Sequence, residues 1–156
     1  MAFSLETIPS QGRRTRFLVV ENDVTSVFAL RQFFATAGYD VDCAAGPIEG
    51  LRLLDRNSYE AVITDLHLAP GSLGEGMLIA AQARLRNPRA CVVMLTANSS
   101  PHTEREARDC GVDVYHTKPV ELAVLTSDIE RVLREHAGNR EHATLALSAA
   151  PPRDEA

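Results

Sequence analysis

The sequence predicts an α/β domain, built as a doubly wound parallel sheet of five strands with helices on both faces. Two observations predict it. Short, almost continuously apolar runs alternate with segments of helical periodicity, and this alternation repeats five times. With 156 residues, 45% of them apolar and 24% charged, the chain suits one domain with a sizeable core. In such sheets, ligands bind beyond the carboxyl ends of the strands.

The first two strand–helix units have distinct boundaries. Phe17–Val20 is short, apolar and rich in branched residues, which indicates a buried strand. Val24–Ala37 follows with apolar residues at helical spacing, and Gly38 fits the position just after a helix end. Tyr39–Ala44 is the second expected strand. Pro47–Arg56 is the second expected helix, because its proline suits a first helical turn.

Three further units complete the pattern. Ala61–Thr64 is the third expected strand, and the helix Gly76–Arg86 ends at Asn87-Pro88, because proline disfavours a helical residue before it. The remaining expected elements are the strands Ala90–Leu95 and Val112–His116 and the helices Thr103–Cys110 and Val120–His136. Right-handed crossovers between parallel strands leave few possible topologies.

The expected domain spans residues 14–136. Residues 1–13 mix Ser, Pro, Gly and Arg without periodicity, so we expect a flexible lead-in. Residues 137–156 are Ala-rich and contain a Pro-Pro pair, which predicts a flexible or disordered tail, although residues 143–150 could form a weak helix.

Composition narrows the class of protein. The net charge of −5 argues against a nucleic-acid partner. No apolar run reaches the length of a membrane span, and the start of the chain lacks the layout of a signal peptide. The chain has an odd number of cysteines, namely Cys43, Cys91 and Cys110. They are widely spaced and set among apolar neighbours. They are typical of reduced core cysteines, so we expect a cytoplasmic protein.

Polar residues follow four of the expected strands. The first strand leads into Glu21-Asn22-Asp23, the third ends at Asp65, the fourth at Thr96 and the fifth at Lys118-Pro119. A carboxylate can accept a phosphoryl group as an acyl phosphate. Neighbouring oxygens can bind Mg²⁺, and a lysine can pair with a phosphoryl oxygen. The set therefore predicts a phosphate-handling site at one edge of the sheet.

These stretches resemble the receiver domain of two-component response regulators. The resemblance covers about residues 15–136 and rests on FLVVEND (17–23), AVITDLHL (61–68), VVMLTAN (92–98) and VYHTKPV (114–120). It implies a flavodoxin-like sheet with the strand order 2-1-3-4-5. It also implies a domain that is phosphorylated by a histidine kinase or a phosphotransfer protein and that then binds a partner differently.

The resemblance implies a role for each strand-end residue. Asp65 corresponds to the phosphoacceptor, and Thr96 and Lys118 to the conserved hydroxyl and lysine that contact the phosphoryl group. Pro119 corresponds to a proline that typically follows a cis peptide bond, and Tyr115 to an aromatic switch residue. The implied Mg²⁺ ligands are Glu21, Asn22, Asp65 and the backbone carbonyl of His67.

Two features depart from the family pattern. Asn22 stands where an aspartate usually ligates the metal, so its amide oxygen could still bind but one negative charge is missing. Asn22 could equally cap the first helix. The loop from Leu66 to Gly76 is longer than usual and carries three glycines, which predicts a mobile segment.

We therefore expect a single-domain response regulator rather than an enzyme. Its output would be partner binding through the face formed by the fourth helix, the fifth strand and the fifth helix, with homodimer formation left open. One alternative is a degenerate receiver that binds partners without phosphorylation. A phosphatase with an aspartyl nucleophile is disfavoured, because such enzymes usually place a second acid where this chain has His67.

Overall fold

The expected elements are all present in the computed structural model, which describes residues 14–69, 71 and 74–148. The strands are β1 (Arg16–Val20), β2 (Asp40–Ala44), β3 (Ala61–Asp65), β4 (Cys91–Thr96) and β5 (Val114–Thr117). The helices are α1 (Val24–Thr36), α2 (Pro47–Arg56), α3 (Glu75–Arg86), α4 (Pro101–Asp109) and α5 (Leu122–Ser148). The expected lead-in of residues 1–13 lies outside the described residues.

The five strands form one parallel sheet in the order β2-β1-β3-β4-β5, which confirms the predicted topology. The register aligns the carboxyl ends of the strands. Val20 is the partner of Thr64 across β1 and β3, Asp65 is the partner of Leu95 across β3 and β4, and Thr96 is the partner of Thr117. The polar residues that follow these strands are therefore brought to one edge of the sheet.

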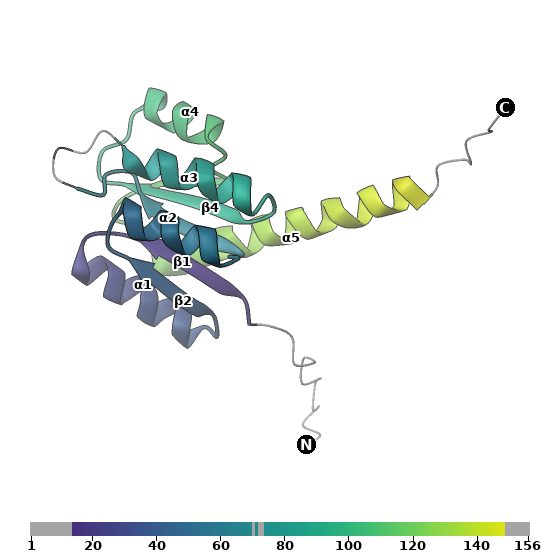
Figure 1. The fold of residues 1–156 in the computed structure, drawn as a ribbon, viewed down its shortest axis with the longest axis horizontal. Helices are drawn as coiled ribbons and strands as arrows, with labels where there is room; N and C mark the ends of the chain where they lie inside the picture. The colour runs from purple at the N-terminus through teal and green to yellow at the C-terminus, as the bar shows by residue number, and fades with distance from the viewer. Residues whose placement is uncertain (1–13, 70, 72–73, 149–156) are drawn as a thin grey trace, which may run out of the picture.

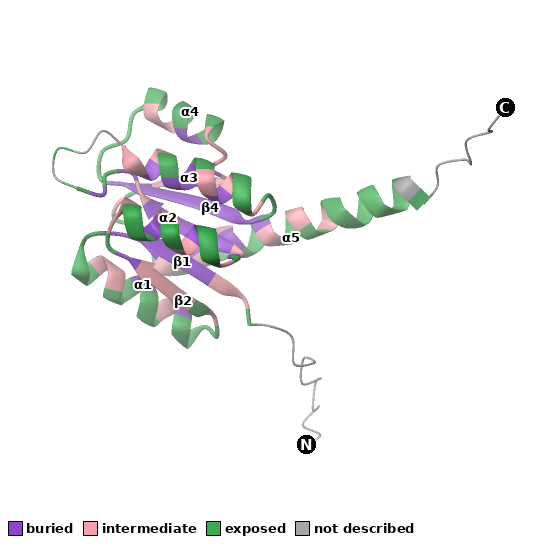
Figure 2. Ribbon diagram, viewed as in Figure 1, coloured by how far each residue is buried: buried purple, intermediate pink, exposed green. Residues whose placement is uncertain are grey.

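The sheet separates two apolar cores, and its central strands are buried on both faces (Figure 2). Because side chains alternate along a strand, neighbouring residues of β1 enter different cores. Phe17 packs with Phe34 of α1 and Ile129 of α5, whereas Leu18 packs with Leu54 of α2 and Ile79 of α3. The continuous apolar runs of the sequence reflect this burial on both faces.

Helix α5 differs most from its expected length. It runs through Ser148, twelve residues beyond the expected end at His136, and projects past the sheet into solvent (Figure 1). The flexible tail expected from residue 137 is therefore helical up to Ser148, and residues 149–156 lie outside the described residues. Alanines and other strong helix formers dominate this segment, and its only helix-breaking residue before the Pro-Pro pair is Gly138.

Smaller differences come from helix caps. Helix α4 begins at Pro101 rather than Thr103, because the Ser100 hydroxyl accepts a hydrogen bond from the backbone N–H of Thr103. Strand β5 begins at Val114, two residues later than expected.

No helix in the described ranges is long and apolar enough to cross a membrane. The three cysteines are free thiols, and burial raises the pKa of Cys91 to about 12.

Candidate phosphoryl-acceptor site

The side chains of Lys118, Asp65 and Glu21 meet at the carboxyl edge of the sheet. The Lys118 ammonium donates hydrogen bonds of 2.8 Å to Oδ2 of Asp65 and of 2.8 Å to Oε2 of Glu21. The peptide bond between Lys118 and Pro119 is cis, as the sequence resemblance implies. Three residues from three strand ends thus form one charged cluster, in which a single ammonium group bonds two carboxylates.

Burial controls the charge balance of this cluster. Glu21 is 2% exposed, and this burial raises the pKa of its carboxyl group; the nearby Asp65 charge adds to the increase and Lys118 opposes it. Burial lowers the pKa of the Lys118 ammonium, but its hydrogen bonds to Asp65 and Glu21 outweigh that effect and the pKa is raised. The lysine therefore stays charged and holds two carboxylates that would otherwise repel each other.

Three consecutive polar residues follow β1, and their side chains lie in different places. They are Glu21, Asn22 and Asp23. Asp23 caps α1, because its carboxylate accepts hydrogen bonds from the backbone N–H and the hydroxyl of Ser26 at 3.1 and 2.6 Å. The capping role considered for Asn22 is therefore wrong, and the Asn22 side chain is exposed to solvent beside the cluster. The backbone N–H of Asp23 also donates to Oε1 of Glu21 at 3.2 Å, so both Glu21 oxygens are engaged.

Thr96 and Tyr115 point to the loop after β4. The Thr96 hydroxyl, which is fully buried, donates to the carbonyl of Asn98 at 2.9 Å and bonds neither carboxylate of the cluster. The Tyr115 hydroxyl donates to the Ser99 hydroxyl oxygen at 3.0 Å. Two of the three expected switch residues, Thr96 and Tyr115 but not Pro119, are thus tied to the same short loop, at positions 98 and 99, rather than to Asp65.

Gly76 is a site residue whose role the sequence did not reveal. A Cβ atom at this position would lie 2.0 Å from the carbonyl oxygen of Asp65 and 2.7 Å from Cα of Leu66. The first turn of α3 can approach the phosphoacceptor strand this closely only because the residue has no side chain. The one signal in the sequence was a glycine at the start of the expected third helix, which does not reveal how close that helix comes to Asp65.

The oxygen donors around Asp65 suit a hard cation. The candidate donors are the carboxylates of Glu21 and Asp65, the Asn22 amide oxygen and the backbone carbonyl of His67; each carboxylate oxygen accepts one hydrogen bond and keeps a further lone pair. The described part of the chain has no group of three or more His, Cys, Asp or Glu side chains arranged to hold a metal ion. An all-oxygen set with few side-chain ligands fits Mg²⁺, which retains several waters in protein sites.

Comparisons with known proteins identify the family of this chain. The model of the response regulator receiver domain matches residues 17–130. The chain is 34% identical over 119 residues to the regulatory protein VanRB of Enterococcus faecalis (76% of this chain and 52% of that protein). It is 32% identical over 120 residues to the transcriptional regulatory protein GlrR of Escherichia coli (77% of this chain and 26% of that protein). The chain spans about half the length, or less, of these curated relatives.

Solved structures share the fold. A CheY-like receiver domain protein from Methanospirillum hungatei has a TM-score of 0.75 and 25% identity, and the match covers 81% of this chain and 99% of that one. A response regulator from Burkholderia pseudomallei, solved with a phosphorylated aspartic acid, a calcium ion and citrate, has a TM-score of 0.69 and 25% identity. That match covers 87% of this chain and 75% of the other.

Proposed function

This chain belongs to the response regulator receiver domain family, and we propose that it accepts a phosphoryl group on Asp65 and thereby changes how it binds a partner. One observation carries the proposal. Asp65 is the last residue of the central strand β3, and its carboxylate lies 2.8 Å from the Lys118 ammonium, at the edge of the sheet where ligands of this fold bind.

The chemistry is transfer between two carriers. An oxygen of the Asp65 carboxylate attacks phosphorus, a P–O bond forms, and the bond from phosphorus to the donor's histidine nitrogen breaks, which returns its electron pair to the imidazole. Lys118 then balances charge on the phosphoryl oxygens. Bound Mg²⁺ would offset the repulsion between the carboxylates and the incoming phosphoryl group, and Glu21, Asp65, Asn22 and the His67 carbonyl would hold it.

The added charge supplies the switch. A phosphoryl group brings about −1.5 to −2 charges and new acceptor oxygens. We infer that the Thr96 hydroxyl then leaves the Asn98 carbonyl and donates to a phosphoryl oxygen. The loop that also holds the Tyr115 hydroxyl would move with it, and α4, β5 and α5 would present a changed face to a downstream protein. One charge-assisted hydrogen bond is worth about 1.5–3 kcal/mol, a shift of about 10- to 150-fold.

Family membership also indicates the class of protein that would donate the phosphoryl group. Receiver domains interact with histidine kinases or phosphotransfer proteins, and we propose a donor of this class for this chain, in the cytoplasm. A hollow of about 450 Å³ beside Lys118, lined by Leu30 of α1 and Leu122 of α5, gives a docking helix access to the cluster. Self-association as a homodimer is an alternative form of output.

A second candidate function is a receiver that binds partners without being phosphorylated. The exposed Asn22 favours it, because an amide attracts a cation less strongly than the carboxylate that usually stands there. We propose no catalytic turnover for either candidate, since His67 rather than a second acid lies two residues after Asp65.

Acetyl phosphate with Mg²⁺, followed by intact-mass measurement, separates the two candidates. We expect the wild-type chain to gain the mass of one phosphoryl group and the Asp65→Asn variant to gain none. Asp109→Asn, which changes an exposed carboxylate on α4, serves as the matched control and should label like wild type. An unlabelled wild type would favour the phosphorylation-independent module, and full labelling of Asp65→Asn would assign the phosphoryl group to another residue.

A further inference from the structure

The amino end of the sheet, opposite the phosphoryl site, has a groove with a basic rim. Two hollows adjoin there and share Arg89 and Leu133 in their linings. The larger measures about 510 Å³ and lies against the loops that precede β3 and β4, and the smaller measures about 190 Å³ and lies against α5. Together the two hollows have the size typical of a small-molecule site. Neither hollow is part of the phosphoryl site.

The lining of the smaller hollow contains two arginines. Arg89 comes from the turn before β4, and Arg140 comes from the part of α5 that projects beyond His136. Neither guanidinium has a hydrogen-bond or ion-pair partner among the described residues. The other lining residues are Leu133, His136 and Ala137, so no carboxylate neutralises the two charges inside this hollow.

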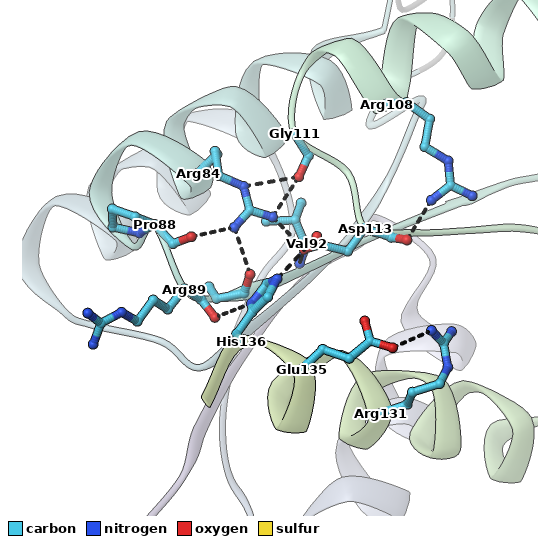
Figure 3. A network of polar contacts seen from close by, with 11 residues as sticks. Arg84, Pro88, Arg89, Val92, Arg108, Gly111, Asp113, Arg131, Glu135 and His136 are labelled. Atoms are coloured by element: carbon cyan, nitrogen blue, oxygen red, sulfur yellow. Dashed lines mark hydrogen bonds and ion pairs between the residues drawn. The ribbon is translucent and has the colours of Figure 1, made fainter. Parts of the chain in front are cut away.

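A rigid polar network holds Arg89 in place. Nδ1 of His136 lies 2.7 Å from the Arg89 carbonyl oxygen and donates to it, and Nε2 of His136 lies 3.7 Å from Oδ1 of Asp113. Asp113 in turn bonds Arg84. Figure 3 shows the Arg89 guanidinium pointing away from this network. The backbone of Arg89 is therefore fixed while its charge is left for another partner.

The larger hollow differs in charge and polarity. Beside Arg86 and Arg89 its lining contains Glu60, whose carboxylate accepts a hydrogen bond from the backbone N–H of Arg16, so it carries a negative charge that the smaller hollow lacks. Its wall also contains Asn87. Oδ1 of Asn87 accepts from the Tyr59 backbone N–H at 3.3 Å, and its buried Nδ2 has no partner among the described residues. Because buried polar groups are almost always paired, this amide marks a place in the wall where a polar partner is missing.

We propose that this groove binds a small phosphate ester, with its phosphate between Arg89 and Arg140 and its neutral organic part in the larger hollow. Guanidinium groups bind phosphate oxygens through paired hydrogen bonds, and the lining of the smaller hollow contains two arginines and no acid. The organic part lies over Leu133 and Pro88, on the side where Glu60 would repel the phosphate. The site is built only when α5 continues far enough to supply Arg140.

The test is a calorimetric titration of the full chain without Mg²⁺, using adenosine monophosphate, inorganic phosphate and adenosine as probes. We expect the ester to bind more tightly than either fragment. Arg89→Ala and Arg140→Ala should each weaken the ester by about tenfold, the scale of one charge-assisted contact. Arg89→Ala leaves the carbonyl that His136 contacts, and alanine is favourable in the α5 helix, so both variants should stay folded.

Two controls make the outcome decisive. Arg134→Ala removes an exposed arginine of the same helix that lines neither hollow, and it should bind like wild type. Asp65→Asn should also bind like wild type, because the groove lies at the other end of the sheet. The proposal is overturned if the ester fails to bind, if it binds no better than free phosphate, or if Arg134→Ala weakens it as much as Arg89→Ala.

Discussion

The two ends of the sheet are each organised around one cation, but the partners of the two cations differ. At the carboxyl end, the Lys118 ammonium bonds two carboxylates, Asp65 and Glu21. At the amino end, the Arg84 guanidinium uses all five of its N–H donors, on the carbonyls of Pro88, Ala90 and Gly111 and on the carboxylate of Asp113.

The two contacts therefore differ in role: the Lys118 contact can change with phosphorylation, whereas the Arg84 contact holds elements of the fold together. The acceptors of Arg84 are mainly backbone carbonyls, whose charge cannot change, so the contact fixes α3, β4 and the turn before β5 in one arrangement. The acceptors of Lys118 are carboxylates, and one of them is the candidate for phosphorylation. Changes at the amino end should therefore affect stability most, and changes at the carboxyl end should affect the response to phosphorylation most.

Arg84→Ala should produce the largest loss of stability. It leaves Asp113 and three carbonyls without their donor in a partly buried place, so we expect the free energy of unfolding to fall by about 3–5 kcal/mol. Urea denaturation measures this loss, and the folded variant should still be labelled by acetyl phosphate. Arg86→Ala breaks only the exposed pair with Asp55 and should cost less than about 1 kcal/mol. Equal losses in the two variants would show that the Arg84 contacts contribute no more to stability than an exposed ion pair.

Lys118→Met should lower stability in a way that depends on pH. Without the ammonium, the pKa of the buried Glu21 rises further, so the native state binds a proton more readily than the unfolded state. We expect a loss of about 2–3 kcal/mol near pH 8, part of which is recovered as the pH falls towards about 5. Urea denaturation at several pH values measures this recovery. The variant should also lose the spectral changes that follow phosphorylation, and retention of those changes would remove Lys118 from the switch.

Gly76→Ala should disturb the phosphoryl site through the backbone. The added Cβ would meet the Asp65 carbonyl at 2.0 Å, so α3 or the end of β3 must move, at a cost of about 1–2 kcal/mol. Phosphorylation by acetyl phosphate should also become slower, as measured by the rate of mass gain. Gly138→Ala, where nothing lies within 4 Å, should instead stabilise α5 by up to about 1 kcal/mol. An unchanged labelling rate in Gly76→Ala would show that the site tolerates the movement.

Asn22→Asp should have the smallest effect on stability, because the side chain is exposed, while it changes metal binding. The added carboxylate strengthens the field on a cation, and we expect Mg²⁺ to bind about tenfold more tightly. Amide NMR shifts of residues 22, 65 and 67 during a Mg²⁺ titration measure the change. Affinity equal to or below that of wild type would show that this side chain does not contact the metal.

The sequence predicted most of the fold because the buried strands and amphipathic helices have distinct periodicities. The helix Pro47–Arg56 was predicted to the residue, and the sheet order followed from the resemblance. The end of α5 was placed too early, because an Ala-rich segment without apolar periodicity has the composition of either a tail or a solvated helix. The role of Asp23 as the cap of α1 could not be separated from that of its neighbour Asn22 by spacing alone.

The sequence by itself determined the set of chemical groups: an acid at the end of β3, a hydroxyl at the end of β4, a lysine after β5 and an amide where a second acid is usual. Only the tertiary structure decided which groups touch. It joined Lys118 to both Asp65 and Glu21, directed Thr96 to Asn98, and brought α3 so close to Asp65 that position 76 must be glycine. Local propensity fixes each element, whereas such contacts join residues far apart in the chain and depend on how the layers pack.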